Sequence, residues 1–255
     1  MLVDTEPSVL TLIGVLQSLP RDSPCLYVDL EGIRLSRHGS ISLITFFVQP
    51  RNCVYVVDVH KLQSAAFNTA TADGITLKSV LESPGIIKVF FDLRNDSDAL
   101  YHHFGVRLCG VEDIQLMENA ARPAFRRRYV NGLDRCITND APISPAEKCN
   151  WKSAKEKGLK LFHPSKGGSY DVFNERPINT DIERYCVIDV QFLPLLRNLY
   201  WGRLNSTWKI KVMVETEKRV RNSQSPAYQP QSDDKKFGPW EGVQSVILSN
   251  RFFEV

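Results

Sequence analysis

Three apolar, β-branched runs follow one another within the first 60 residues, and short turn-rich segments separate them. The runs are PCLYVDL (24–30), SISLITFFV (40–48) and CVYVVDV (53–59). Such runs predict β-strands, and connections this short favour antiparallel neighbours. The chain therefore has to cover a sheet, and the rest of the sequence must supply the covering layers.

The remaining sequence supplies mainly helices. A helix is predicted at residues 7–18, and helical pieces are predicted within 61–83. A fourth strand (85–91) leads into a helix that ends at Gly105, and a short fifth strand precedes another helix within 107–123. Further helices are predicted at 144–158, 179–203 and 204–222. This order predicts an α/β domain with a mixed five-stranded sheet flanked by helices.

The length and composition suit one globular domain with an appendage. The chain has 255 residues, of which 43% are hydrophobic, enough for a sizeable core. We assign residues 1–221 to that domain, with a core at about 22–202. Residues 222–239 are polar, contain three prolines and predict a flexible linker. Residues 240–255 turn apolar again, and both docking onto the body and contact with a partner remain open.

The sequence indicates an intracellular protein of the cytoplasm or nucleus. Its N-terminus, MLVDTEPSVL, is acidic where a signal peptide would be basic. No stretch approaches the roughly 18 uninterrupted apolar residues of a membrane helix. The cysteines form no CxxC pair, which predicts reduced, buried thiols and excludes a zinc site or a disulfide framework. They are Cys25, Cys53, Cys109, Cys136, Cys149 and Cys186.

The first candidate site lies in CLYVDLEG. The strand period of two places Tyr27, Asp29 and Glu31 on one face. Two buried and unpaired carboxylates would cost several kcal/mol each, and a divalent cation removes that cost. The alternative is a strand end that merely exposes both acids to water.

The second candidate lies in KVFFDLRNDSDALYHHFG, where three aspartates compete. Asp96 lies four residues before Leu100 and eight before Phe104, so it continues the inward-facing apolar stripe. Asp98 points elsewhere, and we therefore select Asp96. Asp92 can serve as a helix cap, and an aspartate in the first turn can instead stabilise the helix dipole.

The third candidate lies in ERYCVIDVQFLPLL. Tyr185, Asp189, Phe192 and Leu196 follow a 4-3-4 spacing along one helical stripe. An aspartate in a core-facing stripe needs a partner, and Tyr185, one turn earlier, brings a phenol hydroxyl to the same place. Pro194 should bend the helix just beyond the pair. Taken alone, YxxxD equally fits a surface polar pair.

These signals come in a specific order: a DxE on the first strand, an Asp on the helix after a later strand, and YxxxD on a late helix. This order resembles the DEDDy group of 3′-to-5′ exonucleases, the RNase D-like superfamily. The resemblance covers about residues 25–200 and includes VEDIQLMENA and FNERPI. The segments RNDSDALYHHFGV, GVEDIQLMENAARP and KGGSYDVFNERPI look most like eukaryotic exonuclease-domain-containing and Egalitarian-type members. Arg184 stands where a DEDDh enzyme would have histidine, which favours the tyrosine subtype.

The resemblance implies a ribonuclease H-like fold and hydrolysis of phosphodiester bonds at the 3′ end of single-stranded nucleic acid, with RNA favoured over DNA. It also implies two divalent ions, Mg²⁺ or Mn²⁺, which suit oxygen-only ligands. The implied metal ligands are Asp29, Glu31, Asp96 and Asp189, and Tyr185 completes the catalytic set.

One departure from the family pattern concerns the substrate, and one alternative concerns the function. Gly32 stands where many relatives have a bulky side chain that packs on a base, so nucleotide stacking departs from the family pattern. Some Egalitarian-type relatives resemble catalytically silent, RNA-binding adaptors with a nuclease fold. The complete carboxylate set favours an enzyme, because such adaptors tend to lose members of it.

The charge is distributed unevenly along the chain. Residues 1–120 hold 9 Lys/Arg against 14 Asp/Glu, net −5, whereas residues 121–255 hold 23 against 15, net +8. This asymmetry suggests a carboxylate-rich site beside a surface that attracts an anionic polymer. We assign nucleic-acid contacts to Arg126, Arg127, Arg128 and Lys166. The alternative is an ordinary solvated face for the arginines and a mobile loop, HPSKGGS, around the lysine.

Overall fold

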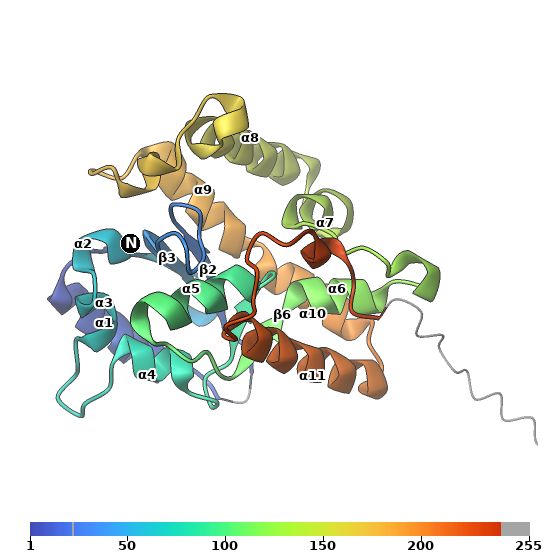
Figure 1. Ribbon diagram of the computed structural model, residues 1–255, viewed down its shortest axis with the longest axis horizontal. Helices are drawn as coiled ribbons and strands as arrows, with labels where there is room; N and C mark the ends of the chain where they lie inside the picture. The colour runs from blue at the N-terminus through green and yellow to red at the C-terminus, as the bar shows by residue number, and fades with distance from the viewer. Residues whose placement is uncertain (22, 241–255) are drawn as a thin grey trace, which may run out of the picture.

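A mixed sheet lies at the centre of the computed structural model, which describes residues 1–21 and 23–240 (Figure 1). Within these residues the sheet has six strands in the order β1-β4-β3-β2-β5-β6. The strands are β1 (Leu2–Val3), β2 (Leu26–Glu31), β3 (Leu43–Val48), β4 (Cys53–Asp58), β5 (Lys88–Phe90) and β6 (Val111–Asp113).

The strand β2 is central because it pairs on both sides. It runs antiparallel to β3, with Asp29 opposite Thr45, and parallel to β5. The antiparallel order of the first three predicted strands is confirmed, and so is the mixed α/β fold. The sheet has one strand more than the five predicted, because β1 adds to its edge. A strand of two residues is too short to produce a sequence period.

The helices surround this sheet (Figure 1). The predicted stretch 179–203 is divided at Phe192, where one helix ends and the next begins with Pro194 in its first turn. The helices are α1 (Glu6–Gln17), α2 (Val59–Leu62), α3 (Ala65–Asn68), α4 (Leu77–Glu82), α5 (Arg94–Phe104), α6 (Ile114–Ala121), α7 (Leu133–Asp140), α8 (Pro145–Phe162), α9 (Thr180–Gln191), α10 (Leu193–Gly202) and α11 (Ser206–Ser223).

The alternation of β2 divides the core into two layers. Leu26, Val28 and Leu30 pack with residues of α1, α4 and α5 on one face of the sheet. Tyr27 packs on the other face, together with apolar residues of α6, α9 and α10. Asp29 and Glu31 share the period of Tyr27, so β2 directs both carboxylates toward the layer that contains α9.

A close helix pair brings the last candidate residues to the sheet. Helices α8 and α9 pack against each other beside β3 and β4. Gly158 of α8 allows this approach, because a Cβ atom there would lie only 2.4 Å from Cδ2 of Tyr185 on α9. The buried residues Trp151, Ala154 and Phe162 complete the inner face of α8.

Residues 224–239, which we call the C-terminal strap, make many contacts with the body. The Arg37 side chain donates hydrogen bonds to the carbonyl oxygens of Ser225 and Pro226, and Tyr228 donates to Asn95 at the start of α5. This differs from the predicted flexible linker. Polar side chains hold the strap in place of an apolar face, and such partners leave no trace in local composition.

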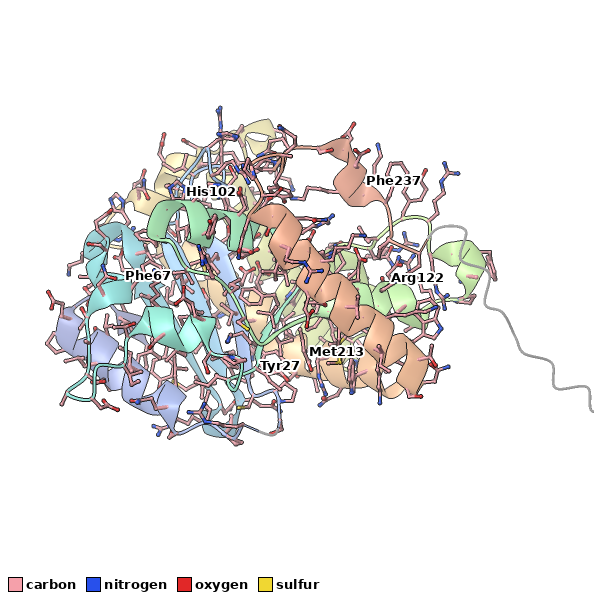
Figure 2. The ribbon with its side chains drawn as sticks, turned by 60° about the horizontal axis from the view of Figure 1, so that its bottom comes forward. Tyr27, Phe67, His102, Arg122, Met213 and Phe237 are labelled. Carbon is pink, nitrogen blue, oxygen red and sulfur yellow. The ribbon has the colours of Figure 1, made fainter. Side chains whose placement is uncertain are left out.

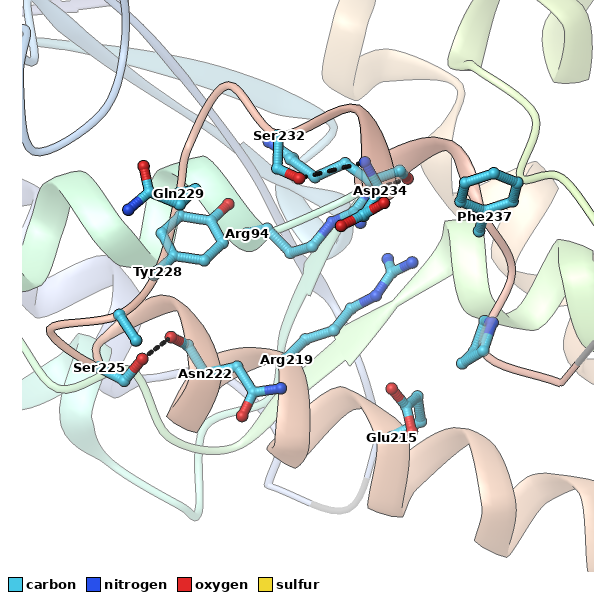
Figure 3. Close-up of a pocket in the computed structure, with 13 residues that line it drawn as sticks. Arg94, Glu215, Arg219, Asn222, Ser225, Tyr228, Gln229, Ser232, Asp234 and Phe237 are labelled. Carbon is cyan, nitrogen blue, oxygen red and sulfur yellow. Dashed lines mark hydrogen bonds between the residues drawn. The ribbon is translucent and has the colours of Figure 1, made fainter.

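The strap and α11 border an open cavity of about 530 Å³ (Figure 3). Arg94 and Arg219 extend into this region, but each is ion-paired, Arg94 with Asp92 at 2.6 Å and Arg219 with Asp113 at 2.7 Å. The cavity is therefore lined by side chains that already hold β6, α5 and α11 together. The predicted apolar tail lies, apart from Trp240, outside the described residues.

Two expectations from composition can be compared with the structure. The cysteines are free thiols, but Cys109 and Cys149 are exposed, so the prediction that all are buried is wrong for these two. Cys109 lies in the loop before β6, and Cys149 lies on an exposed surface of α8. Across residues 1–21 and 23–240, no helix combines the length and apolarity that crossing a membrane requires.

Candidate active site

Three carboxylates converge where β2 meets α9. Asp29 and Glu31 come from β2, and Asp189 comes from the last turn of α9. One carboxylate oxygen from each lies within 4.8 Å of the other two. The DxE and the YxxxD, which are 158 residues apart between Glu31 and Asp189, therefore form one site.

Asp96 lies beside these three carboxylates but is not part of the group whose oxygens lie within 4.8 Å of one another. The Leu30 backbone amide lies near enough to its carboxylate to lower the pKa of Asp96, so Asp96 lies close to the β2 residue between Asp29 and Glu31. Its charge contributes to the raised pKa of both of those carboxyls. The competing Asp98 faces away and forms a buried ion pair with Arg37 at 2.7 Å.

Burial and mutual repulsion disfavour the ionised carboxylates. Burial, followed by repulsion from Asp189, raises the pKa of Glu31 to about 8. Burial, followed by the nearby charge of Asp92, raises the pKa of Asp96 to about 7. The pKa values of Asp29 and Asp189 are also raised by burial. The nearby ammonium groups, Lys155 beside Asp189 and Lys235 near Asp96, oppose these shifts but do not outweigh burial.

Two oxygen atoms of the site show what kind of group it can accept. Oδ2 of Asp29 and Oδ1 of Asp96 are buried and have no hydrogen-bond partner. A buried acceptor without a partner is costly. A donor set made only of carboxylate oxygens suits a hard divalent cation such as Mg²⁺ or Mn²⁺ and does not suit zinc. The residues present therefore fit the metal ions that the resemblance implies.

Tyr185 is held firmly next to Asp189. Its hydroxyl lies near enough to the Asp189 carboxylate to lower the pKa of that group, and its ring lies edge-on to Phe162 with the centroids 5.1 Å apart. Burial and the surrounding carboxylates raise the pKa of Tyr185 well above its ordinary value. The phenol therefore stays protonated at neutral pH.

Lys155 of α8 also enters the site, and sequence reasoning missed it. Its ammonium donates to both carboxylate oxygens of Asp189 at 2.7 Å and lies 3.8 Å from the centroid of the Tyr185 ring. From the sequence, Lys155 is one of several lysines on a charged helix. The available signal is its position one turn after Trp151 and beside Ala154, at the edge of the buried stripe of α8.

The candidate nucleic-acid contacts do not all lie at the surface. Arg126 and Arg128 are exposed, and so is Lys166 in the loop after α8. Arg127 is buried, because its guanidinium stacks on Trp208 at 3.9 Å and donates to the carbonyl oxygen of Ala120. The assignment of Arg127 to nucleic acid is therefore not supported by its position.

Gly32 has a structural role that explains its departure from the family pattern. A Cβ atom at this position would lie 2.1 Å from the carbonyl oxygen of Ser40. The segment after β2 turns back on itself here, so no side chain fits. The stacking group that many relatives have at this position is excluded by the backbone.

Comparison with known proteins adds to this geometry. A family model described as 3′-5′ exonuclease matches residues 2–134, which is more than half of the chain. The chain belongs to the 3′-5′ exonuclease family. Its acidic residues Asp29, Glu31, Asp96 and Asp189 follow the DEDD order. The match ends before Tyr185 and Asp189, so the structure supplies the link between the third motif and the first two.

Individual relatives agree with this placement. The piRNA biogenesis protein EXD1 of Xenopus laevis is 27% identical over 189 residues, which are 72% of this chain and 39% of that protein. RNase D of Trypanosoma brucei has a TM-score of 0.71 and 22% identity, covering 93% of this chain and 78% of that one. The same RNase D in complex with RNA U12 has a TM-score of 0.68 and 22% identity, covering 88% and 70%. The chain thus spans about two fifths of the Xenopus protein, and the solved structures show the shared fold.

Proposed function

We propose that this chain is a metal-dependent 3′-to-5′ exonuclease that hydrolyses phosphodiester bonds at the 3′ end of single-stranded nucleic acid, with RNA favoured over DNA. The observation that carries the proposal is the convergence of Asp29, Glu31 and Asp189 within 4.8 Å in a chain of the exonuclease family. The preference for RNA is supported by the RNA-bound RNase D of similar fold and by the name of the EXD1 relatives.

Four carboxylates would hold the metal in this proposal: Asp29, Glu31, Asp96 and Asp189. When bound, two divalent ions supply an activated water and stabilise the charge on the leaving oxygen. Mg²⁺ and Mn²⁺ are both compatible with the donor set. The unpaired buried oxygens of Asp29 and Asp96 support this assignment, because ligation is the simplest way to satisfy them.

The chain's own residues have distinct tasks around these ligands. Tyr185 keeps its proton because its pKa is raised, so its hydroxyl orients the attacking water and does not act as the base. Lys155 holds the Asp189 carboxylate through both of its oxygens. At the surface, Arg126, Arg128 and Lys166 would contact phosphates.

A second candidate function is a nuclease-fold adaptor that binds RNA without cleaving it. One observation favours it: the Lys155 ammonium already neutralises Asp189, one of the proposed metal ligands. If that ion pair persists in solution with metal present, the site would hold less metal and turnover would be low. RNA binding would then be the activity of the domain.

One assay separates these two functions. A single-stranded oligonucleotide, labelled at either its 5′ or its 3′ end, is incubated with the protein in Mg²⁺, Mn²⁺ or EDTA. The exonuclease shortens the 5′-labelled strand in steps and releases the 3′ label at once, and both EDTA and Asp29→Asn abolish this. Cleavage that persists in EDTA or in Asp29→Asn contradicts the metal site. Tight binding of the strand with no cleavage in any metal supports the adaptor.

A further inference from the structure

A second pocket lies on the side of the molecule that carries α6, α7 and α10, apart from the carboxylates. Its volume is about 750 Å³. Arg122 and Phe237, labelled in Figure 2, mark this side of the molecule. Arginines dominate its lining: Arg122, Arg126, Arg128, Arg135 and Arg203. We call it the arginine pocket.

The carboxylates of the arginine pocket do not balance this charge. Glu118 and Asp140 are its acidic lining residues. Glu118 is already ion-paired with Arg122 and accepts a hydrogen bond from Asn131, and Asp140 accepts one from Tyr200 at 2.8 Å. Arg126, Arg135 and Arg203 are exposed, and these three alone exceed the two carboxylates of the concave surface. The resulting positive charge attracts anions.

Aromatic rings alternate with these arginines. Phe125 is 81% exposed, and the Arg126 guanidinium lies 5.4 Å from its ring centroid. Tyr129 is 47% exposed and stacks on Phe237 of the C-terminal strap, with the centroids 5.4 Å apart. An anion site for phosphate alone needs no exposed phenylalanine, whereas a base can stack on such a ring.

The loop that carries these groups is rigidly held. Asn119 donates to the carbonyl oxygens of Arg127 and Tyr129, and Arg122 donates to those of Arg126 and Tyr129. The buried Arg127 anchors the middle of the loop on Trp208. Neighbouring side chains therefore project outward in a fixed arrangement, which lowers the entropy lost on binding.

We propose that the arginine pocket is a second nucleotide-binding subsite, which takes the phosphate and base of a single-stranded nucleic acid away from the cleavage site. The proposal rests on the proposed function, because the strand is the same one whose 3′ end enters the carboxylate site. Asp189 and Tyr200 are 11 residues apart on α9 and α10, or roughly 16 Å if the two helices ran straight. A strand of several nucleotides spans both sites.

The test measures binding in EDTA, in the Asp29→Asn background, so that cleavage does not enter. Fluorescence anisotropy compares a trinucleotide with a strand of about 15 nucleotides, the upper end of known single-strand site sizes. Phe125→Ala should weaken binding of the long strand by roughly five- to a hundredfold, the range for loss of one stacked base. The loss for the trinucleotide should be smaller. Phe125→Trp should restore binding of the long strand.

A matched control is available on another face. Arg107 is exposed and lies 5.8 Å from the ring of Tyr101, so it has the same chemistry outside the arginine pocket. Arg107→Gln should leave binding unchanged, whereas Arg126→Gln combined with Arg135→Gln should weaken long-strand binding and flatten its salt dependence.

Several outcomes overturn the subsite. Equal losses for both lengths, unchanged binding in Phe125→Ala, or equally tight binding of an abasic strand would show that no base stacks here. Equally tight binding of a polyglutamate peptide would assign the pocket to acidic protein segments. Failure of the proposed function is recognised separately, since it would appear as absent cleavage by the wild-type protein in the end-labelling assay while anisotropy still reports strand binding.

Discussion

Two aspartates on one helix have opposite environments, and the contrast gives a direct test of the second motif. Asp96 faces Asp29 with a partnerless oxygen, whereas Asp98 is buried in an ion pair with Arg37. Asp98→Asn should lower the free energy of unfolding, by up to about 3–5 kcal/mol, because a buried guanidinium loses its counter-charge. Asp96→Asn should weaken Mn²⁺ binding without that loss. Urea unfolding and calorimetric titration measure the two effects, and the opposite ranking would show that Asp98 is the ligand.

Tyr185→Phe removes one hydroxyl and keeps the aromatic ring, so it tests the role of that hydroxyl alone. The ring contacts with Phe162 and Gly158 remain in the variant, while the donor to Asp189 is lost. We expect the single-turnover rate to fall about 10²- to 10⁴-fold, the usual effect of a proton-handling group, with nucleic-acid affinity within a few-fold of wild type. A rate close to wild type in saturating Mn²⁺ would reduce Tyr185 to a packing role.

The Lys155 ammonium is ion-paired with Asp189, a proposed metal ligand. Lys155→Met should destabilise the metal-free protein, because Asp189 loses its ion-pair partner. The same change should tighten Mn²⁺ binding, since the metal no longer competes with the ammonium for the carboxylate. Thermal unfolding in EDTA and Mn²⁺ titration measure both. Lys152→Met, at an exposed position of the same helix, is the control, and weaker Mn²⁺ binding in Lys155→Met would show that the lysine supports the metal.

At the scale of elements, the approach of α8 and α9 depends on one glycine. Gly158→Ala places a Cβ atom 2.4 Å from the Tyr185 ring, so the helices must separate. We expect a loss of about 1–3 kcal/mol in the free energy of unfolding and slower hydrolysis, because Tyr185 and Asp189 move together. Gly14→Ala in α1 is the matched control, since nothing lies within 4 Å of its Cβ position.

The control should behave in the opposite way. Alanine has a higher helix propensity than glycine, so Gly14→Ala should stabilise the protein by up to about 1 kcal/mol. Circular dichroism during urea unfolding measures both variants. If Gly158→Ala proved as stable as Gly14→Ala, with an unchanged rate, α8 would not determine the position of the tyrosine.

Elements with a strong period could be predicted from the sequence, and those held by distant polar partners could not. The alternation in β2 placed Asp29 and Glu31 on the correct face, and Gly105 ends α5 with a φ of 64°, as its position predicts. The C-terminal strap is fixed by bonds such as Tyr228 to Asn95, which are 133 residues apart. Composition carries no information about partners at that separation.

The same distinction applies to the site. All four proposed ligands follow from strand or helix periods, but Lys155 reaches Asp189 only because Gly158 lets α8 approach α9. Arg127 turns inward for a comparable reason, since Trp208 of α11 lies against its loop. The sequence around Lys155 and around Arg127 gives no sign of either contact. Tertiary packing, which local sequence does not specify, decides both.

At the scale of the whole molecule, the fold concentrates negative charge at the junction of its layers and leaves basic residues at the periphery. The carboxylates lie between the sheet and the helices, half-buried on β2 and buried on α5 and α9, and their pKa values are raised. The arginine pocket lies on the outer side of α6 and α10. A folded protein with such a centre is stable only if its acids stay protonated or gain a cation.

This arrangement predicts a specific dependence of stability on pH. In the metal-free protein Glu31 and Asp96, with pKa values of about 8 and about 7, keep protons that the unfolded chain releases at ordinary carboxyl pKa values. The folded state then binds more protons than the unfolded state, so these groups stabilise the protein at low pH and that stability is lost as the pH rises toward 8.

Divalent metal should remove this dependence, because it binds the ionised carboxylates and stabilises only the folded state. The melting temperature in EDTA should therefore fall between about pH 5 and pH 8, while the gain on adding Mg²⁺ should grow over the same interval. In Glu31→Gln, which cannot ionise at this position, the EDTA curve should be flatter. Parallel curves with and without Mg²⁺, in both proteins, would mean that the buried carboxylates exchange neither protons nor metal in this range, and the metal site would have to be abandoned.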